Sequence, residues 1–195
     1  MSTAERVLTS TVVPKNPEGN YAFYEAGFLR GHEFIRRELS RAEIALVHLD
    51  VIAHPWKIAM IYEWFLDFFI PVVKMHHTIE DDAIFPYYLS LGLVAPDRHT
   101  EDHITLEGRL TKLKSLLVKI HDTAKNNGEK TLLVAMVDRL RSDFQVLSQG
   151  LREHFNEEEE FWPPILKKYG SVSMICCMFA KDRLMNCTLE KLVSL

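Results

Sequence analysis

Four long segments of this 195-residue chain carry apolar residues at alternating steps of three and four. That spacing places the apolar side chains of each segment on one face of an α-helix. No segment shows the strict alternation of a half-buried strand. We therefore predict an all-α fold, an antiparallel up-down four-helix bundle in which each helix buries one face in a shared core. The expected helices cover residues 21–49, 55–91, 97–126 and 129–161.

The connections follow from the residues that break this periodicity. His54-Pro55, the stretch from Gly92 to Pro96 and Asn126-Asn127-Gly128 separate the helices. We expect Pro71 to distort the second helix and Pro163-Pro164 to end the fourth. The predicted organisation is an N-terminal extension over residues 1–20, the bundle over 21–166 and a C-terminal tail over 167–195. A short fifth helix is expected within that tail, between Ser171 and Leu195.

Composition narrows the range of partners. The chain has 23 basic and 27 acidic residues and a net charge of −4, which gives no reason to expect nucleic acid or an anionic membrane surface. Charges interrupt every apolar run, and the first residues lack the pattern of a signal peptide. The three cysteines, Cys176, Cys177 and Cys187, do not form a disulfide framework. We expect a cytoplasmic protein with no membrane span.

One motif occurs twice. His76 is followed four residues later by Glu80, and His154 is followed four residues later by Glu158, with a proline six residues after each glutamate. Residues four apart share a helix face, so each pair can bind one side of a metal centre. A single such pair is usually a hydrogen-bonded surface pair. Two copies with matching surroundings favour a metal site.

Ionisable residues interrupt all four apolar stripes. Burying such groups is costly unless they are paired or bind a metal. Imidazole and carboxylate together suit iron, manganese or zinc, and two carboxylates facing one another suit a dinuclear centre. The first and second halves of the chain each supply one such set, which predicts two similar half-sites bridged by the glutamates. The interrupting residues are His32, His76 with Glu80, His103, and His154 with Glu158.

Two assignments have alternatives. His77 and Asp81 have the same spacing as His76 and Glu80, and either pair fits the motif. We choose His76 and Glu80 because they continue the apolar stripe that passes through Val73. His99 lies four residues before His103 on the same predicted face and is a further candidate ligand.

These segments resemble the hemerythrin-like family, the His-His-Glu cation-binding domains. The resemblance extends over about residues 25–165 and is carried by residues 31–36, 76–86, 101–103 and 153–163. It implies a bundle that holds two iron ions as an oxo- or hydroxo-bridged non-haem di-iron centre. The small ligand implied is a diatomic molecule such as dioxygen, and the function is oxygen binding or the sensing of iron or oxygen. The alternative is a di-iron enzyme acting on peroxide or nitric oxide.

The resemblance also implies how the ligands divide. One iron takes His32 and His76, the other takes His103 and His154, and Glu80 and Glu158 bridge. Oxygen-carrying hemerythrins use a His followed five residues later by Asp on the last helix. This chain has glutamates at both four and five residues after His154, which favours the broader hemerythrin-like group. Ferritin-like di-iron proteins use Glu-x-x-His, a motif that does not occur in this chain.

Overall fold

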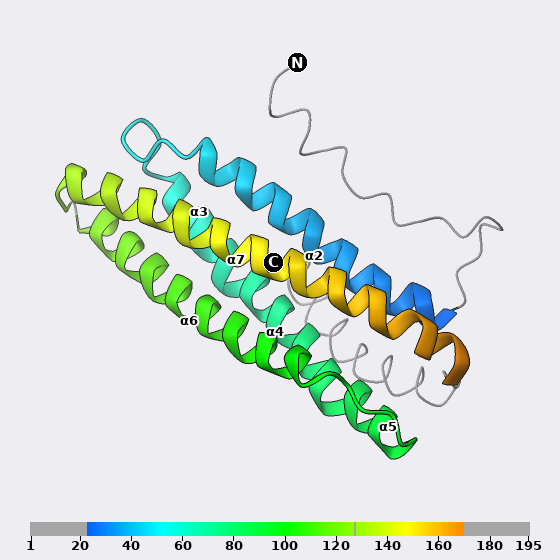
Figure 1. The fold of residues 1–195 in the computed structure, drawn as a ribbon. Helices are drawn as coiled ribbons and strands as arrows, with labels where there is room; N and C mark the ends of the chain where they lie inside the picture. Colours follow the sequence, from blue (N-terminus) through cyan, green and yellow to red (C-terminus); the bar gives the residue numbers. More distant parts are fainter. Residues whose placement is uncertain (1–22, 127, 170–195) are drawn as a thin grey trace.

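The computed structural model of the chain describes residues 23–126 and 128–169. These residues form helices joined by short connections and contain no strand (Figure 1). The all-α prediction is confirmed for this part of the chain. The N-terminal extension, the expected fifth helix and the three cysteines lie outside the described residues. No helix in the described ranges combines the length and apolar character that crossing a membrane requires.

Four long helical stretches account for the fold. The first is α2, and the second is built from five consecutive segments, two of which are π-helical turns. The third and fourth are α6 and α7. In order, the segments are α2 (Phe23–Val47), α3 (Lys57–Glu63), η1 (Trp64–Phe69), α4 (Ile70–Ile79), η2 (Glu80–Ile84), α5 (Phe85–Ser90), α6 (Asp97–Lys125) and α7 (Lys130–Tyr169).

The long stretches lie side by side and enclose one interior (Figure 1). Helix α7 packs against both α2 and α6, and α4 contacts α2 and α6. Most of the interior is a cluster of aliphatic and aromatic side chains. A second, smaller cluster forms around Ile84, Tyr88 and Trp162. Along the second stretch, His76, His77 and Glu80 come after Val73 of the first cluster and before Ile84 of the second, so the candidate site lies where the two apolar layers meet.

The two π-helical turns both precede a proline. Segment η1 ends two residues before Pro71, and η2 ends two residues before Pro86. A proline has no N–H, and its ring collides with the carbonyl four residues back. At Pro71 and Pro86 the helix accommodates this collision by widening the turn before the proline. In η2 the Phe85 N–H accordingly donates to the Glu80 carbonyl, five residues back. The distortion expected at Pro71 is present as such a turn.

The wider turns also change which residues face inward. Up to Val73 the buried face follows the predicted stripe. Continued past Glu80 at steps of three and four, this stripe predicts that Ala83 and Tyr87 face inward, but both are only half-buried. A π turn contains more residues than an α-helical turn. After such a turn, the residue that faces inward therefore comes about one position later than an α-helical pattern predicts. The buried residues of this part are His77, Glu80, Ile84 and Tyr88.

Helix α7 does not end where it was predicted to end. It continues through Pro163 and Pro164 to Tyr169, eight residues beyond the expected end at Phe161. Trp162 is 1% exposed, and its ring stacks on that of Phe85 at 5.1 Å. Burying a large aromatic side chain offsets much of the roughly 3 kcal/mol that an interior proline costs. The predicted start of the tail at residue 167 therefore falls inside a helix.

Candidate metal centre

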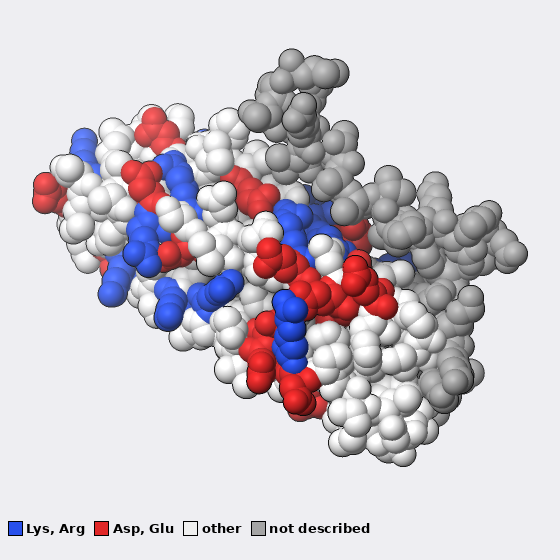
Figure 2. Space-filling view, viewed as in Figure 1, with Lys and Arg blue, Asp and Glu red and all other residues white. Residues whose placement is uncertain are grey.

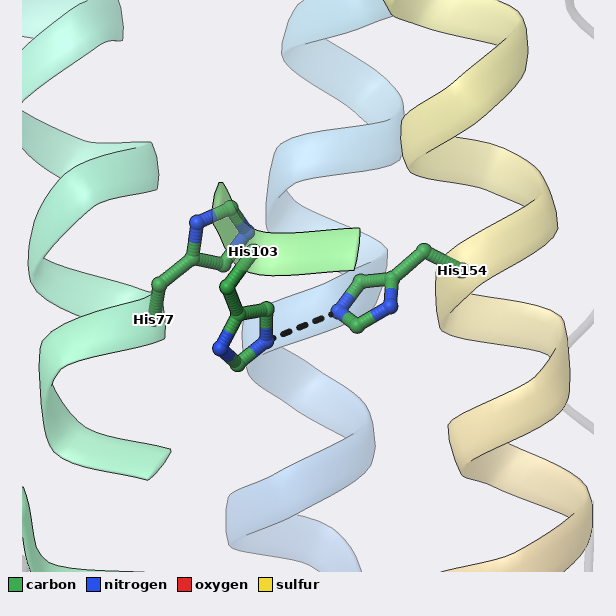
Figure 3. A group of neighbouring side chains, drawn as sticks. All are labelled: His77, His103 and His154. Carbon is green, nitrogen blue, oxygen red and sulfur yellow. Dashed lines mark hydrogen bonds between the residues drawn. The ribbon is translucent and has the colours of Figure 1, made fainter. Parts of the chain in front are cut away.

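Histidines from three of the long stretches converge between the two apolar layers. Figure 3 shows His77 from α4, His103 from α6 and His154 from α7 pointing toward one another. The Nε2 atoms of His103 and His154 are 3.0 Å apart. His32 from α2 completes the set, so every long helical stretch contributes a histidine. All of these side chains are at most 2% exposed.

One group of ligand atoms gathers around His32 and His76. The Nε2 atom of His32 lies 3.6 Å from Glu80 Oε1 and 3.3 Å from Glu158 Oε2. The Nε2 atom of His76 lies 3.4 Å from Glu80 Oε2. One ligand atom from each of these four residues falls within a 4.8 Å span, close enough to share one metal ion. We call this group the first half-site.

A second group uses the same two carboxylates. The Nε2 atom of His103 lies 3.5 Å from Glu80 Oε2 and 3.7 Å from Glu158 Oε1. The Nε2 atom of His154 lies 3.3 Å from Glu158 Oε2. We call this group the second half-site. Glu80 and Glu158 thus each face histidines of both half-sites, which is the placement required of bridging ligands.

Many polar atoms of this cluster lack hydrogen-bond partners among the described residues. They include Nε2 of His76, both ring nitrogens of His77 and both carboxylate oxygens of Glu80 and Glu158. A buried polar atom without a partner costs about 1–3 kcal/mol, and a charged one costs more. Nitrogen and carboxylate oxygen donors that converge in a dry interior suit iron, manganese or zinc. The residues present therefore fit a metal centre.

In the metal-free cluster, the pKa values of two buried histidines are raised by the neighbouring carboxylates. Burial, together with the charge of Glu158, raises the pKa of Glu80 to about 7. Burial would lower the pKa of His32, but its contacts with Glu158, Glu159 and Glu80 raise it to about 10. The same balance raises the pKa of His103 to about 9. Without a metal, protons on these two histidines counter the charge of the carboxylates.

Two acids that directly follow the inner glutamates, Asp81 and Glu159, contact histidines from the other side; Asp81 was the alternative ligand to Glu80. Asp81 Oδ1 accepts a hydrogen bond from His103 Nδ1 at 2.9 Å. Glu159 Oε1 accepts one from His32 Nδ1, also at 2.9 Å. Both acids lie on the outer side of the histidines, whereas Glu80 and Glu158 are 1% and 0% exposed on the inner side. In the sequence, these two acids could have been found because an acidic residue directly follows each inner glutamate.

His76 and His77 are both close to the cluster, although the sequence reasoning chose only His76. His77 is 0% exposed, and its ring stacks on that of His103 at 4.2 Å. Its ligand atom lies within 4.8 Å of those of His103 and His154. His76 belongs to the first half-site and His77 lies against the second. His77 follows the buried Val73 by a step of four within α4, whereas the predicted stripe continued from Val73 to His76 by a step of three.

His99 is buried beside the cluster but does not converge with it. Its side chain is 3% exposed, and its ring lies 6.3 Å from that of His154. Among the described residues, the groups whose ligand atoms come together do not include it. Its nearest rings are those of Phe161 and Trp162, at 5.6 and 6.0 Å. Its role as a ligand stays a prediction.

The comparisons with known proteins bear on the same span. Residues 28–166 match the family model described as the hemerythrin HHE cation binding domain. Comparisons with curated proteins and with solved structures gave no match. The matched span contains both half-sites and the acids outside them. With most of its length matched in this way, the chain belongs to the hemerythrin HHE cation-binding domain family.

Proposed function

We propose that this protein holds a non-haem di-iron centre in an antiparallel up-down bundle over residues 21–166, and that it binds dioxygen or senses iron or oxygen. The observation that carries the proposal is the position of the two inner carboxylates. Glu80 and Glu158 each lie within 3.3–3.7 Å of histidine nitrogens of both half-sites. Carboxylates shared in this way suit two metal ions held close together.

The two metal positions would draw on different helices. His32 and His76 hold the first position, and His103 and His154 hold the second. His77 lies within reach of the second position, and Glu80 and Glu158 are common to both. When bound, a di-iron centre supplies reversible electron exchange with a small oxidising ligand. The protein supplies a fixed set of neutral nitrogen and charged oxygen donors.

The surroundings of the cluster favour a small ligand over an organic substrate. Aromatic rings close over the histidines, with Phe155 stacked on His32 at 4.4 Å and Phe85 on His103 at 5.8 Å. These rings exclude water, which strengthens the electrostatic interactions inside. A diatomic molecule fits such a site more readily than a large substrate. Acidic side chains predominate where α6 and α7 pass over the cluster (Figure 2), which favours the approach of cations.

One observation favours the enzyme alternative. His154 Nδ1 lies 3.7 Å from Asp102 Oδ2, and the Asp102 side chain is 31% exposed. An approach of these two groups to hydrogen-bonding distance would connect the cluster with the surface. Turnover of peroxide or nitric oxide needs such a route for protons, whereas reversible binding of dioxygen does not.

Iron loading of the full chain tests the proposal. Metal-free protein supplied with Fe²⁺ without oxygen should take up about two iron ions per chain. Admitting and removing oxygen should change its absorption spectrum reversibly if the protein binds dioxygen. Rapid consumption of added peroxide or nitric oxide would instead support the enzyme.

Matched variants make the test specific. Glu80→Gln combined with Glu158→Gln should abolish loading at both positions. Asp82→Asn combined with Glu160→Gln removes the same charge from exposed positions nearby and should load normally. If the unaltered chain binds no iron, or if the inner and outer double variants load equally, the proposed centre is wrong.

A further inference from the structure

Each inner glutamate is followed in the chain by an acid that contacts a histidine of the opposite helix pair. Asp81 follows Glu80 and accepts a hydrogen bond from His103 on α6. Glu159 follows Glu158 on α7 and accepts one from His32 on α2. The first helix pair, residues 23–90, therefore supports a histidine of the second pair, residues 97–169, and the second supports one of the first.

The geometry of these contacts determines which nitrogen faces the centre. In both histidines Nδ1 points outward to the acid, and Nε2 points inward toward Glu80 and Glu158. A histidine that binds a metal through one nitrogen commonly donates the other N–H to a carboxylate. That bond fixes the tautomer and the ring orientation and makes the ligand more basic.

From this arrangement we infer that Asp81 and Glu159 are positioning residues of the metal centre, each holding a histidine from across the bundle with its Nε2 atom inward. The inference rests on the proposed two-metal centre and adds to it two residues that are not ligands. Neither acid contributes to the groups of converging ligand atoms. Neither acid would bind the metal; each would act on a metal position through the histidine that it contacts.

The two acids differ in their own surroundings. Arg36 donates to Glu159 twice, from Nη1 to Oε1 at 2.5 Å and from Nη2 to Oε2 at 3.1 Å. The Arg36 side chain is 7% exposed and also donates to Asn156 Oδ1 at 2.9 Å. Asp81 is 36% exposed, and no lysine or arginine among the described residues forms an ion pair with it. Glu159 therefore neutralises a buried cation, whereas Asp81 does not.

This difference predicts unequal effects. Replacing Glu159 with glutamine leaves the buried guanidinium of Arg36 without its carboxylate, close to the place where two metal cations would bind. An uncompensated buried charge is strongly unfavourable, and here it also repels the metal. Replacing Asp81 with asparagine removes only the support of His103. Loss of Glu159 should therefore weaken metal binding more than loss of Asp81.

Titration with Zn²⁺ measures these effects on the full, metal-free chain. Asp81→Asn and Glu159→Gln should each weaken Zn²⁺ binding by about 10- to 100-fold, with Glu159→Gln toward the upper end. The matched controls Asp82→Asn and Glu160→Gln remove the same charges one residue further along, at exposed positions. They should bind Zn²⁺ as the unaltered chain does.

A second substitution separates positioning from general damage to the fold. Arg36→Met removes the buried cation and should restore part of the Zn²⁺ affinity of Glu159→Gln, but none of the affinity of Asp81→Asn. Nitrogen NMR of the Zn²⁺-loaded protein reports the tautomer of each ring. Asp81→Asn should alter the signals of His103 and leave those of His32 unchanged, and Glu159→Gln should do the reverse.

The possible failures are distinguishable. If the unaltered chain takes up no metal, the proposed centre fails and this inference fails with it. If the unaltered chain binds Zn²⁺, but Asp81→Asn and Glu159→Gln bind it like their controls with unchanged histidine signals, only the positioning role is wrong. A variant with lower helix content by circular dichroism, and no rescue by Arg36→Met, would also overturn the role assigned to Glu159.

Discussion

Protons and the proposed metal ions would compete for the ring nitrogens of His32 and His103. Their pKa values in the folded, metal-free protein are about 10 and about 9, above the ordinary value of 6.5. A raised pKa in the folded state contributes stability that is fully present below pH 6.5 and is lost as the pH rises through the folded pKa. Metal ligation requires the deprotonated ring, so its dependence on pH has the opposite sign.

The two forms of the protein should therefore respond differently to alkali. Between about pH 7 and pH 9.5, the melting temperature of the metal-free protein should fall as His32 and His103 lose their protons. The metal-loaded protein should show no such fall, because its ligands are already deprotonated. Below about pH 6.5 it should lose metal. Thermal unfolding of both forms across this range checks the prediction, which fails if the metal-free protein becomes more stable with rising pH.

The adjacent histidines provide a second test at this scale. His76→Ala should weaken the first metal position, because His76 groups with His32 and Glu80. His77→Ala should weaken the second, because His77 groups with His103 and His154. His48→Ala, at an exposed residue, should change neither. Stepwise Zn²⁺ titration separates the two positions, and full metal content in both His76→Ala and His154→Ala would refute the ligand assignment.

The sequence was most informative about which residue types belong to the candidate site, and least informative about which helix face each of them occupies. His32, His103, His154, Glu80 and Glu158 were identified because each interrupts an apolar stripe, and the structure brings them together. The choice between His76 and His77 could not be made from the stripe, because steps of three and of four from Val73 both stay on one face of a helix. The contacts of Asp81 and Glu159 join residues 22 and 127 positions apart, and no local pattern predicts such contacts.

At the scale of the helices, their existence and approximate limits were predictable, but their ends at prolines were not. Strong periodicity identified all four long stretches. The π turns before Pro71 and Pro86 and the continuation of α7 past Pro163 depend on tertiary packing. A proline specifies a missing hydrogen bond, and it does not specify whether a helix widens, bends or ends there.

Glycines in and beside α6 offer a test of helix energetics away from the cluster. A Cβ atom at Gly108 would meet nothing within 4 Å, so Gly108→Ala should stabilise the protein by about 0.5–1 kcal/mol. A Cβ atom at Gly128 would lie 2.5 Å from Thr123 Cγ2 and 2.9 Å from the Thr123 carbonyl oxygen. Gly128→Ala should therefore destabilise it. Urea unfolding of both variants measures the two changes, and equal signs would contradict the local geometry.

At the scale of the whole molecule, the proposed metal centre would also tie the helices together. Every long stretch contributes a candidate ligand, so a metal that binds only the folded chain would add its binding free energy to folding. That contribution is about 2.7 kcal/mol when free metal is 100-fold above the dissociation constant.

Removing the metal should therefore lower the melting temperature of the protein. The expected shift is about 5–10 °C, since each kcal/mol moves the midpoint of a chain of this size by about 2–4 °C. Calorimetry before and after chelation, with metal content verified, measures it. A chelated sample that melts together with the loaded one would show that the metal does not stabilise the fold.

The crossed contacts of Asp81 and Glu159 make each helix pair depend on the other. Neither helix pair contains a complete half-site, because each supplies the outer acid and one inner carboxylate that the other requires. The centre therefore resembles an interface between two complementary partners. The connection over residues 91–96 adds no ligand and acts as a tether, which sets the effective concentration at which the two pairs meet.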